Sequence, residues 1–318
     1  MSNRAGAYPG QPALADPLSR RPPRAARLTP DARLGYLLLA PTAALIVLLI
    51  GYPFVRALWL SFHKKLLGRA EAPWIGLDNY TGLLHDVRFW QAVKNVFIFT
   101  GGSVVLKLAI GLTVALILNE ALPLRGLWRS LVLLPYAMPT LVTVLVWKWM
   151  YNDTAGVLDY LVNQVGLKQG PVLWLSDPGK AMGAVIAVNV WRGFPFFVIT
   201  LLAGLQAVPE DLYDAAKVDG AGPWSRFRAV TLPGILPVMA VVTLFSTILT
   251  FNDFAIIWVL TKGGPGNATD VLATLTYKIA IPGLELGKGV AVSVLMLPIL
   301  VVLIVLLNRF IARREEAI

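Results

Sequence analysis

Residues 214–233 read DAAKVDGAGPWSRFRAVTLP, between apolar runs centred on residues 179–204 and 231–260. Each of these runs is long enough to cross a bilayer as a helix, which needs about 20 mostly apolar residues. The stretch that joins them carries charged side chains, which are costly inside hydrocarbon. We therefore expect this segment to lie outside the lipid, where another protein binds it.

The same region carries the signals of two short helices. Pro209 followed by Glu210 and Asp211 is typical of a helix start, because proline needs no hydrogen-bond partner there and acidic side chains favour the helix dipole. This predicts a helix over 210–219, with Gly220 just past its end. A second short helix is predicted from about residue 223. Its apolar side is formed by Trp224, Phe227 and Val230, and its basic side by Arg226 and Arg228. The two predict a helix-turn-helix across the cytoplasmic face, with an ordinary amphipathic surface loop as the alternative.

The composition indicates an all-α integral membrane protein. Hydrophobic residues make up 57% of the 318 residues, charged residues only 14%, and the mean hydropathy is +0.67. Such a chain has too little polar surface to cover a water-soluble globule. The absence of cysteine excludes disulfides and thiolate metal sites. The net charge of +10 is better explained by basic cytoplasmic loops than by nucleic-acid binding.

Six apolar runs qualify as transmembrane helices: residues 34–62, 92–119, 128–151, 179–204, 231–260 and 288–311. An even number of spans places both termini on one side, and we assign that side to the cytoplasm. The excess of Lys and Arg there is moderate, and the basic segment 1–33 supplies much of it. That segment is rich in Pro, Arg and Ala and is predicted to be a disordered cytoplasmic tail. The first apolar run is expected to be a retained span rather than a signal peptide.

Polar residues near the middle of the spans are candidates for binding a substrate, because such groups tend to face a cavity rather than lipid. Those on the third, fourth and fifth runs are Tyr136; Asn189, Arg192 and Gly193; and Ser246, Thr250 and Asp253. The spacings of three and four residues put each set on one helix face. Arg192 and Asp253 could form a charge pair that either binds hydroxyl groups or only neutralises itself. Lys107, in the second run, is expected to snorkel or to pair within the bundle.

The ordered string in residues 214–233 resembles the EAA loop of the permease subunits of ABC importers. Its matching positions are Asp214, Ala215, Ala216, Asp219, Gly220, Ala221 and Phe227, followed by Leu232 and Pro233. The resemblance extends over about residues 34–314 through YLLLAPTAALIVLLIGYPF, GLDNYTGLL, LLPYAMP, VWRGFPFF and LTKGGPG. It narrows to carbohydrate-uptake permeases similar to the maltose and glycerol-3-phosphate permeases. Asp214 departs from the usual glutamate, and the large external domain of the maltose subunit has no counterpart.

This resemblance implies a permease domain over 34–314 whose loop 205–233 couples to an ATPase. It implies as partners a second homologous permease, an ATPase dimer that binds ATP, a substrate-binding protein and a carbohydrate. It also implies a bacterial or archaeal inner membrane, and it places the seven midspan candidates on positions that line the sugar site. Arg192 departs from the family, which has an apolar residue there. The particular sugar is not identified.

Enzymatic chemistry finds no support in the sequence. The stretch at 283–289, GLELGKG, has one residue too few for a P-loop and lacks its Ser or Thr, so this chain is not expected to bind ATP. The two histidines, His63 and His85, both fall in the first external loop without a zinc-hydrolase motif. No catalytic residue, cofactor or metal is therefore predicted. A stand-alone secondary transporter or channel remains the alternative function, and a membrane enzyme ranks last.

Overall fold

The computed structural model describes residues 30–166 and 170–315, and most of the predicted tail at 1–33 lies outside these ranges. Its coordinates divide into two units, residues 1–54 and 55–318. Helix α1 (Pro30–Ile46) of the first unit passes through a π-helical turn, η1 (Val47–Gly51), into α2 (Tyr52–Ser61), which includes the boundary between the units. The first four residues of α1, 30–33, fall within the segment predicted to be disordered.

The second unit contains the remaining helices. They are α3 (Asp78–Leu84), α4 (Val87–Asn119), α5 (Arg125–Ala137), α6 (Thr140–Met150), α7 (Val157–Gln164), α8 (Pro178–Gln206), α9 (Glu210–Val218), α10 (Pro223–Arg226), the π-helical turn η2 (Phe227–Thr231), α11 (Leu232–Phe251), α12 (Ala255–Leu260), α13 (Leu272–Ala280) and α14 (Leu286–Glu315). Within the described ranges all regular elements are helical, apart from one isolated bridge between His63 and Trp74.

The prediction of an all-α membrane protein is confirmed. Five helices are long and apolar enough to cross a membrane: Leu34–Ser61, Val87–Asn119, Pro178–Gln206, Pro223–Phe251 and Leu286–Arg309. The third predicted run is not one straight span, because α5 and α6 meet at 89°. Met138 is extended there, as expected of a residue before proline, and Pro139 has no N–H to continue the helix.

The fifth predicted run is also interrupted. Helix α11 ends at Phe251, and a new helix, α12, starts at Ala255. Asp253 explains the break, because its carboxylate accepts a hydrogen bond from the backbone N–H of Ile256 at 3.1 Å. A carboxylate that binds the free N–H groups of a first helical turn favours a new helix start at that point.

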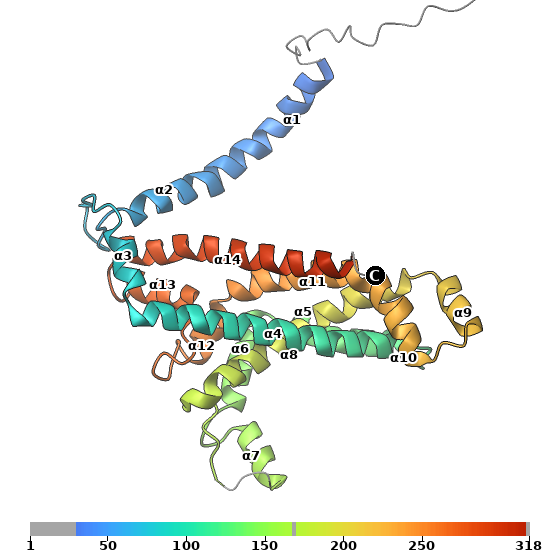
Figure 1. Ribbon diagram of the computed structural model, residues 1–318. Helices are drawn as coiled ribbons and strands as arrows, with labels where there is room; N and C mark the ends of the chain where they lie inside the picture. Colours follow the sequence, from blue (N-terminus) through green and yellow to red (C-terminus); the bar gives the residue numbers. More distant parts are fainter. Residues whose placement is uncertain (1–29, 167–169, 316–318) are drawn as a thin grey trace, which may run out of the picture. The chain divides into compact units, whose positions relative to one another are not determined.

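Close packing of α4 against α8 forms the centre of the second unit. Figure 1 shows the long helices α4, α8, α11 and α14 side by side, with α9 at one end and α12 and α13 toward the other. At Gly111 the two helices approach so closely that an added Cβ would lie under 3.0 Å from Cβ of Phe197, and Phe197 is fully buried. The backbones of α4 and α8 are so close at this crossing that only glycine fits there.

Aspartate side chains begin both of these helices. Asp86 accepts the N–H of Arg88 at 2.9 Å at the start of α4, and Asp177 accepts the N–H of Gly179 at 2.8 Å at the start of α8. Hydrogen bonds from the Arg88 side chain lower the pKa of Asp86, and the hydrogen bond from Lys180 lowers the pKa of Asp177. Both carboxylates therefore stay ionised at neutral pH, as suits a position next to the positive end of a helix dipole.

A buried polar network fixes the segment between α12 and α13. The Asp270 carboxylate, only 5% exposed, accepts hydrogen bonds from Lys278 Nζ at 2.8 Å and from Thr274 Oγ1 at 2.5 Å. Asn95 of α4 donates its side-chain amide to the backbone oxygens of Asp270 at 2.8 Å and Asn267 at 3.0 Å. This network ties the loop to the long helix.

Replacing Lys278 with methionine is expected to lower the free energy of unfolding by about 1.5–3 kcal/mol, because the buried Asp270 carboxylate loses its charged donor. Lys288→Met is the matched control, since its ion pair with Glu285 is 3.9 Å long and Glu285 is 51% exposed. The control should change stability by less than about 1 kcal/mol. Tryptophan fluorescence during denaturation in detergent measures both, and equal losses would contradict the role of the network.

Candidate functional site

The polar residues predicted from the spans converge in the interior of the second unit. Asn189 on α8 and Thr250 on α11 are 5% and 2% exposed, and Ser246 is buried one turn before Thr250 on the same face. Asp253 follows in the break between α11 and α12. The structure thus brings the α8 set and the α11 set together. We call Lys107, Asn189, Arg192, Gly193, Ser246, Thr250 and Asp253 the interior cluster.

Asn189 joins the two helices by binding Asp253. Its side-chain amide donates to Asp253 Oδ2 at 3.1 Å, while Asp253 Oδ1 accepts the N–H of Ile256. The side-chain oxygen of Asn189 is buried and has no hydrogen-bond partner among the described residues. It remains available to a hydroxyl donor.

The expected charge pair between Arg192 and Asp253 does not form. No ion pair within 4.0 Å joins them, and within ranges 30–166 and 170–315 Arg192 makes no hydrogen bond or ion pair with any residue described. Neutral donors, the Asn189 amide and the N–H of Ile256, bind the two oxygens of Asp253 instead. Within the interior cluster, the guanidinium of Arg192 is therefore a donor that no described residue uses.

Lys107 belongs to the cluster, although the sequence analysis gave it no substrate role. It is 4% exposed, and its ammonium donates to Thr250 Oγ1 at 3.1 Å, which confirms the expected pairing within the bundle. Its side chain passes over Gly193, where an added Cβ would lie 2.5 Å from Lys107 Cε. The missing side chain at Gly193 thus makes the space for this lysine. A mid-span lysine was the signal that could have found it.

Aromatic contacts link Tyr136 to the two helices, α8 and α11, that carry most of this cluster. Its ring is 47% exposed and stacks on Phe196 at 6.1 Å between centroids, and Phe196 contacts Phe245 at 5.7 Å. Phe245 precedes Ser246 on α11. The three rings form a row on which an apolar face of a sugar ring could stack, whereas the buried polar groups could bind its hydroxyls.

The hydrogen-bond pattern predicts which pairs of residues are coupled. In a double-mutant cycle, Asn189→Ala and Asp253→Ala should show a coupling free energy of about 1.5–3 kcal/mol, because they remove the two ends of one hydrogen bond to a charged group. Arg192→Leu with Asp253→Asn should couple by less than about 1 kcal/mol, as expected of charges that share no bond. Chemical denaturation of the purified variants measures both cycles. A stronger coupling in the second cycle would contradict this arrangement.

The second set of predicted residues forms a tightly hydrogen-bonded helix end. Gly220 has φ +76°, the left-handed conformation expected of the residue just past a helix. Its N–H binds the carbonyl of Lys217 at 3.0 Å, and the N–H of Ala221 binds the carbonyl of Ala216 at 2.9 Å. These two bonds are a Schellman motif, which pairs Ala216 with Ala221 where only small side chains are present. The prediction of a helix end at Gly220 is confirmed.

The surface around this turn is exposed and mixed in character. Val218 is 88% exposed and Trp224 68%, and Trp224 stacks on Phe227 at 5.4 Å. Asp214 pairs with Lys217 at 2.8 Å, and both side chains are more than half exposed. Exposed apolar side chains grouped beside charged ones are typical of a protein-binding surface.

The second short helix differs from the prediction. α10, η2 and α11 form one continuous helix, Pro223–Phe251, so Trp224 and Phe227 lie on the first turns of an apolar span. The helix therefore does not lie as a separate element across the membrane face. Tyr213 of α9 contacts its side through Thr231, with the two hydroxyl oxygens 3.1 Å apart. Figure 1 shows α9 and α10 together at one end of the long helices.

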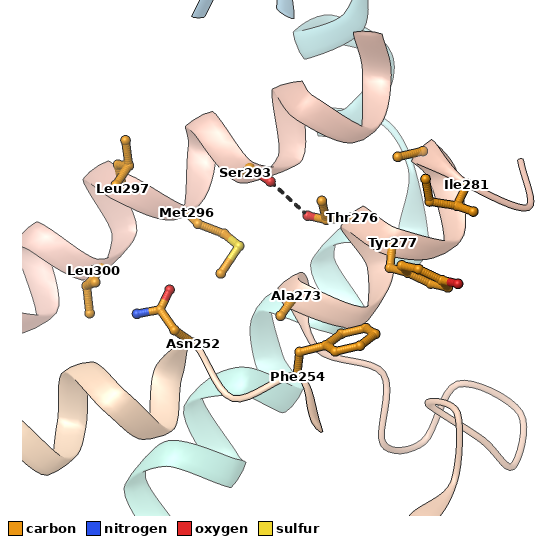
Figure 2. Close-up of a pocket in the computed structure, with 11 residues that line it drawn as sticks. Asn252, Phe254, Ala273, Thr276, Tyr277, Ile281, Ser293, Met296, Leu297 and Leu300 are labelled. Atoms are coloured by element: carbon orange, nitrogen blue, oxygen red, sulfur yellow. Dashed lines mark hydrogen bonds between the residues drawn. The ribbon is translucent and has the colours of Figure 1, made fainter. Parts of the chain in front are cut away.

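A separate cavity of about 450 Å³ lies beside the break between α11 and α12. Figure 2 shows it bounded by α13 and α14, with Thr276 and Ser293 joined by a 3.3 Å hydrogen bond and with Met296 and Phe254 beside it. Asn252 also lines it, and donates its amide to the Ile248 carbonyl at 2.8 Å. The cavity lining includes no residue of the interior cluster.

Comparisons with known proteins agree on one family. A family model described as "Binding-protein-dependent transport system inner membrane component" matches residues 107–316, which include every member of the interior cluster. The trehalose/maltose transport system permease protein MalF of Thermococcus litoralis is 39% identical over 265 residues, covering 83% of this chain and 89% of that protein. The sulfoquinovosyl glycerol transport system permease protein SmoG of Agrobacterium fabrum is 35% identical, covering 84% and 86%.

A solved structure has a similar fold. It is that of a bacterial ABC transporter involved in the import of the acidic polysaccharide alginate, with a TM-score of 0.77 and 24% identity. The match covers 89% of this chain and 96% of the solved chain. This protein therefore shares its fold with the matched chain of that structure.

Proposed function

This chain belongs to the family of inner-membrane components of binding-protein-dependent transport systems, and we propose that it forms half of the translocation pathway of an ATP-driven carbohydrate importer. It is a multi-pass membrane protein with relatives that are transport permeases. The observation that carries the proposal is the match to sugar-transport permeases over more than four fifths of the chain. Those relatives are named for different sugars, so the match leaves the sugar itself open.

The loop at 205–233 is the proposed binding surface for the ATPase. Its helix α9 carries an exposed face, and its turn is held by the two hydrogen bonds of the Schellman motif at Gly220. Asp214, Ala215, Ala216, Asp219, Gly220, Ala221 and Phe227 are the residues proposed to contact or to position the ATPase. A hydrogen-bonded and partly apolar turn suits such a contact, because a preorganised surface loses less entropy on binding. This proposal puts the loop and both termini in the cytoplasm.

The interior cluster and Tyr136 are the proposed contacts for the sugar. Unpartnered buried groups support this, namely the side-chain oxygen of Asn189 and the Nε of Arg192. The exposed row of aromatic rings at Tyr136 supplies a complementary apolar surface. The other wall of the pathway is proposed to come from a second, homologous permease, and a binding protein delivers the sugar.

Reconstitution distinguishes an ATP-driven importer from the alternative, a stand-alone secondary transporter or channel. The chain is coexpressed with a second permease and an ATPase, placed in liposomes, and supplied with a sugar-loaded binding protein. ATP-dependent sugar uptake is expected, together with copurification of the ATPase. Uptake by the chain alone, without ATPase or ATP, would instead establish a secondary transporter or channel.

A further inference from the structure

We propose that the interior cluster selects a carbohydrate that carries an anionic group, such as a carboxylate, sulfonate or phosphate, and that Lys107 and Arg192 hold that group. The inference rests on the proposed function, because it names the class of substrate that the pathway takes. It follows from the balance of charges in the interior and from two cations whose hydrogen-bonding capacity is largely unused.

The helices that surround the cluster carry no acidic residue. α4, α5, α6, α8 and α11 contain neither Asp nor Glu, so Asp253 is the carboxylate that faces these cations from the described elements. The ammonium of Lys107 lies within electrostatic range of both Asp253 and Arg192. The cluster therefore holds two cations and one carboxylate. An uncompensated charge in a poorly solvated interior is costly, and an anionic ligand would balance it.

The Asp253 carboxylate is not placed to neutralise either cation directly. Its oxygens are bound by the amide of Asn189 and the N–H of Ile256, each at 3.1 Å. Within the described ranges no cation lies within 4.0 Å of Asp253. The two cations are thus left for another acceptor.

Arg192 has the geometry for such an acceptor. A guanidinium presents N–H donors in a planar fork that matches the oxygens of carboxylate, sulfonate or phosphate. In the described part of the chain none of these donors is used, and the Nε is buried. A buried donor without a partner is costly unless a ligand binds it.

Lys107 contributes the second donor. Its ammonium has three N–H groups, of which one binds Thr250 Oγ1 at 3.1 Å. Its stem crosses Gly193, the residue that follows Arg192. The lysine is thereby held at the Arg192 turn of α8 in a nearly fully buried position. A neutral sugar would offer these two cations hydroxyl groups but no charge.

The local potential can be measured without any transport. The chain has no cysteine, so Leu249→Cys introduces a single reporter next to Thr250 at a position that is 56% exposed. The assembled transporter is labelled with two methanethiosulfonates that differ in charge, sulfonatoethyl and trimethylammonioethyl. The ratio of their rates is compared with the ratio at Val165→Cys, which is 71% exposed at the end of α7 and lies outside the surface proposed to bind the ATPase.

We expect the anionic reagent to be favoured at Leu249→Cys relative to Val165→Cys. Adding Lys107→Gln or Arg192→Gln should each lower that preference about fourfold, the effect of one unit charge at about 10 Å on reagents of opposite sign. Lys94→Gln is the matched control, because Lys94 is an exposed lysine on α4, about 20 Å along the helix from Lys107. Arg192→Gln, at a less buried position, covers the case in which Lys107→Gln fails to fold. A preference that neither substitution lowers overturns the proposal.

Uptake tests the substrate class itself. The reconstituted importer is offered paired probes that differ in one anionic group: glycerol 3-phosphate with glycerol, sulfoquinovosyl glycerol with glucosyl glycerol, and a uronate-ended disaccharide with maltose. ATP-dependent uptake is expected for an anionic member and not for its neutral partner. Uptake of a neutral member at an equal or greater rate overturns this inference and leaves the importer standing. Absence of ATP-dependent uptake for every probe counts against the importer, while the labelling ratios still decide the charge of the cluster.

Discussion

Replacing Gly111 with valine is expected to destabilise the protein by about 3 kcal/mol or more and to abolish most of its folded yield. The added side chain would lie under 3.0 Å from Cβ of Phe197, and the backbone of Phe197 and Val198 lies only 3.4 Å away. A change of side-chain rotamer at Phe197 or Val198 cannot relieve this clash, because the clashing atoms are a Cβ and the main chain. α4 and α8 would have to separate along the contact that forms the centre of the second unit.

Gly101→Ala on the same helix is the control for this prediction. No atom lies within 4 Å of the added Cβ at Gly101, so alanine should be neutral or should stabilise the helix by about 0.5–1 kcal/mol. Thermal and denaturant unfolding of both purified variants in detergent, with size-exclusion profiles, gives the comparison. A stable, monodisperse Gly111→Val protein would show that the two helices can move apart cheaply.

Gly220→Val is expected to reduce binding-protein-stimulated ATP hydrolysis about tenfold while leaving the membrane bundle folded. Valine in the left-handed conformation costs about 1–3 kcal/mol, enough to shift the turn away from its native form by such a factor. The space around Gly220 is open, so the effect arises from its φ of +76° and not from a clash. ATPase assays on the reconstituted complex measure it.

Gly222→Ala tests whether any glycine in this loop would behave the same way. Gly222 has φ −69° and no neighbour within 4 Å, so alanine fits without strain. Stimulated ATP hydrolysis should stay near that of the unaltered protein. If Gly220→Val retained full stimulation and normal assembly, the turn would not be the coupling element that we propose.

The sequence predicted local structure well where short-range chemistry decides it. The helix over 210–219 and its end at Gly220 follow from a proline, two acidic residues and a glycine, all of which act within one turn of the chain. The prolines at 135 and 139 mark the third run as a place for a bend, but its size of 89° could not be predicted from hydropathy. Hydropathy counts the apolar residues along a run, and it does not tell whether the helix formed by that run is straight or bent.

The sequence predicted which residues form the candidate site, but it did not predict which of them are hydrogen-bonded to one another. Helix periodicity placed Asn189 and Arg192 on one face and Thr250 with Asp253 on another. It could not give the rotation of one helix against the next, which decides that Asn189 rather than Arg192 meets Asp253. Lys107 was undervalued for the same reason, because its place depends on the gap at Gly193 of a distant helix.

The continuity of the helix Pro223–Phe251 makes it a lever arm. From Trp224 to Thr250 the helix rises about 39 Å, so a tilt of about 5° at one end displaces the other by about 3 Å. That displacement is about as large as the 3.1 Å distance between Lys107 Nζ and Thr250 Oγ1 in their hydrogen bond. A small rotation imposed at the exposed α9 surface would therefore suffice to make or break the bond that holds the lysine. The helix has two weaker points, the π-helical turn at Phe227–Thr231 and the interior Pro237, and their stiffness determines how much of the rotation reaches Thr250.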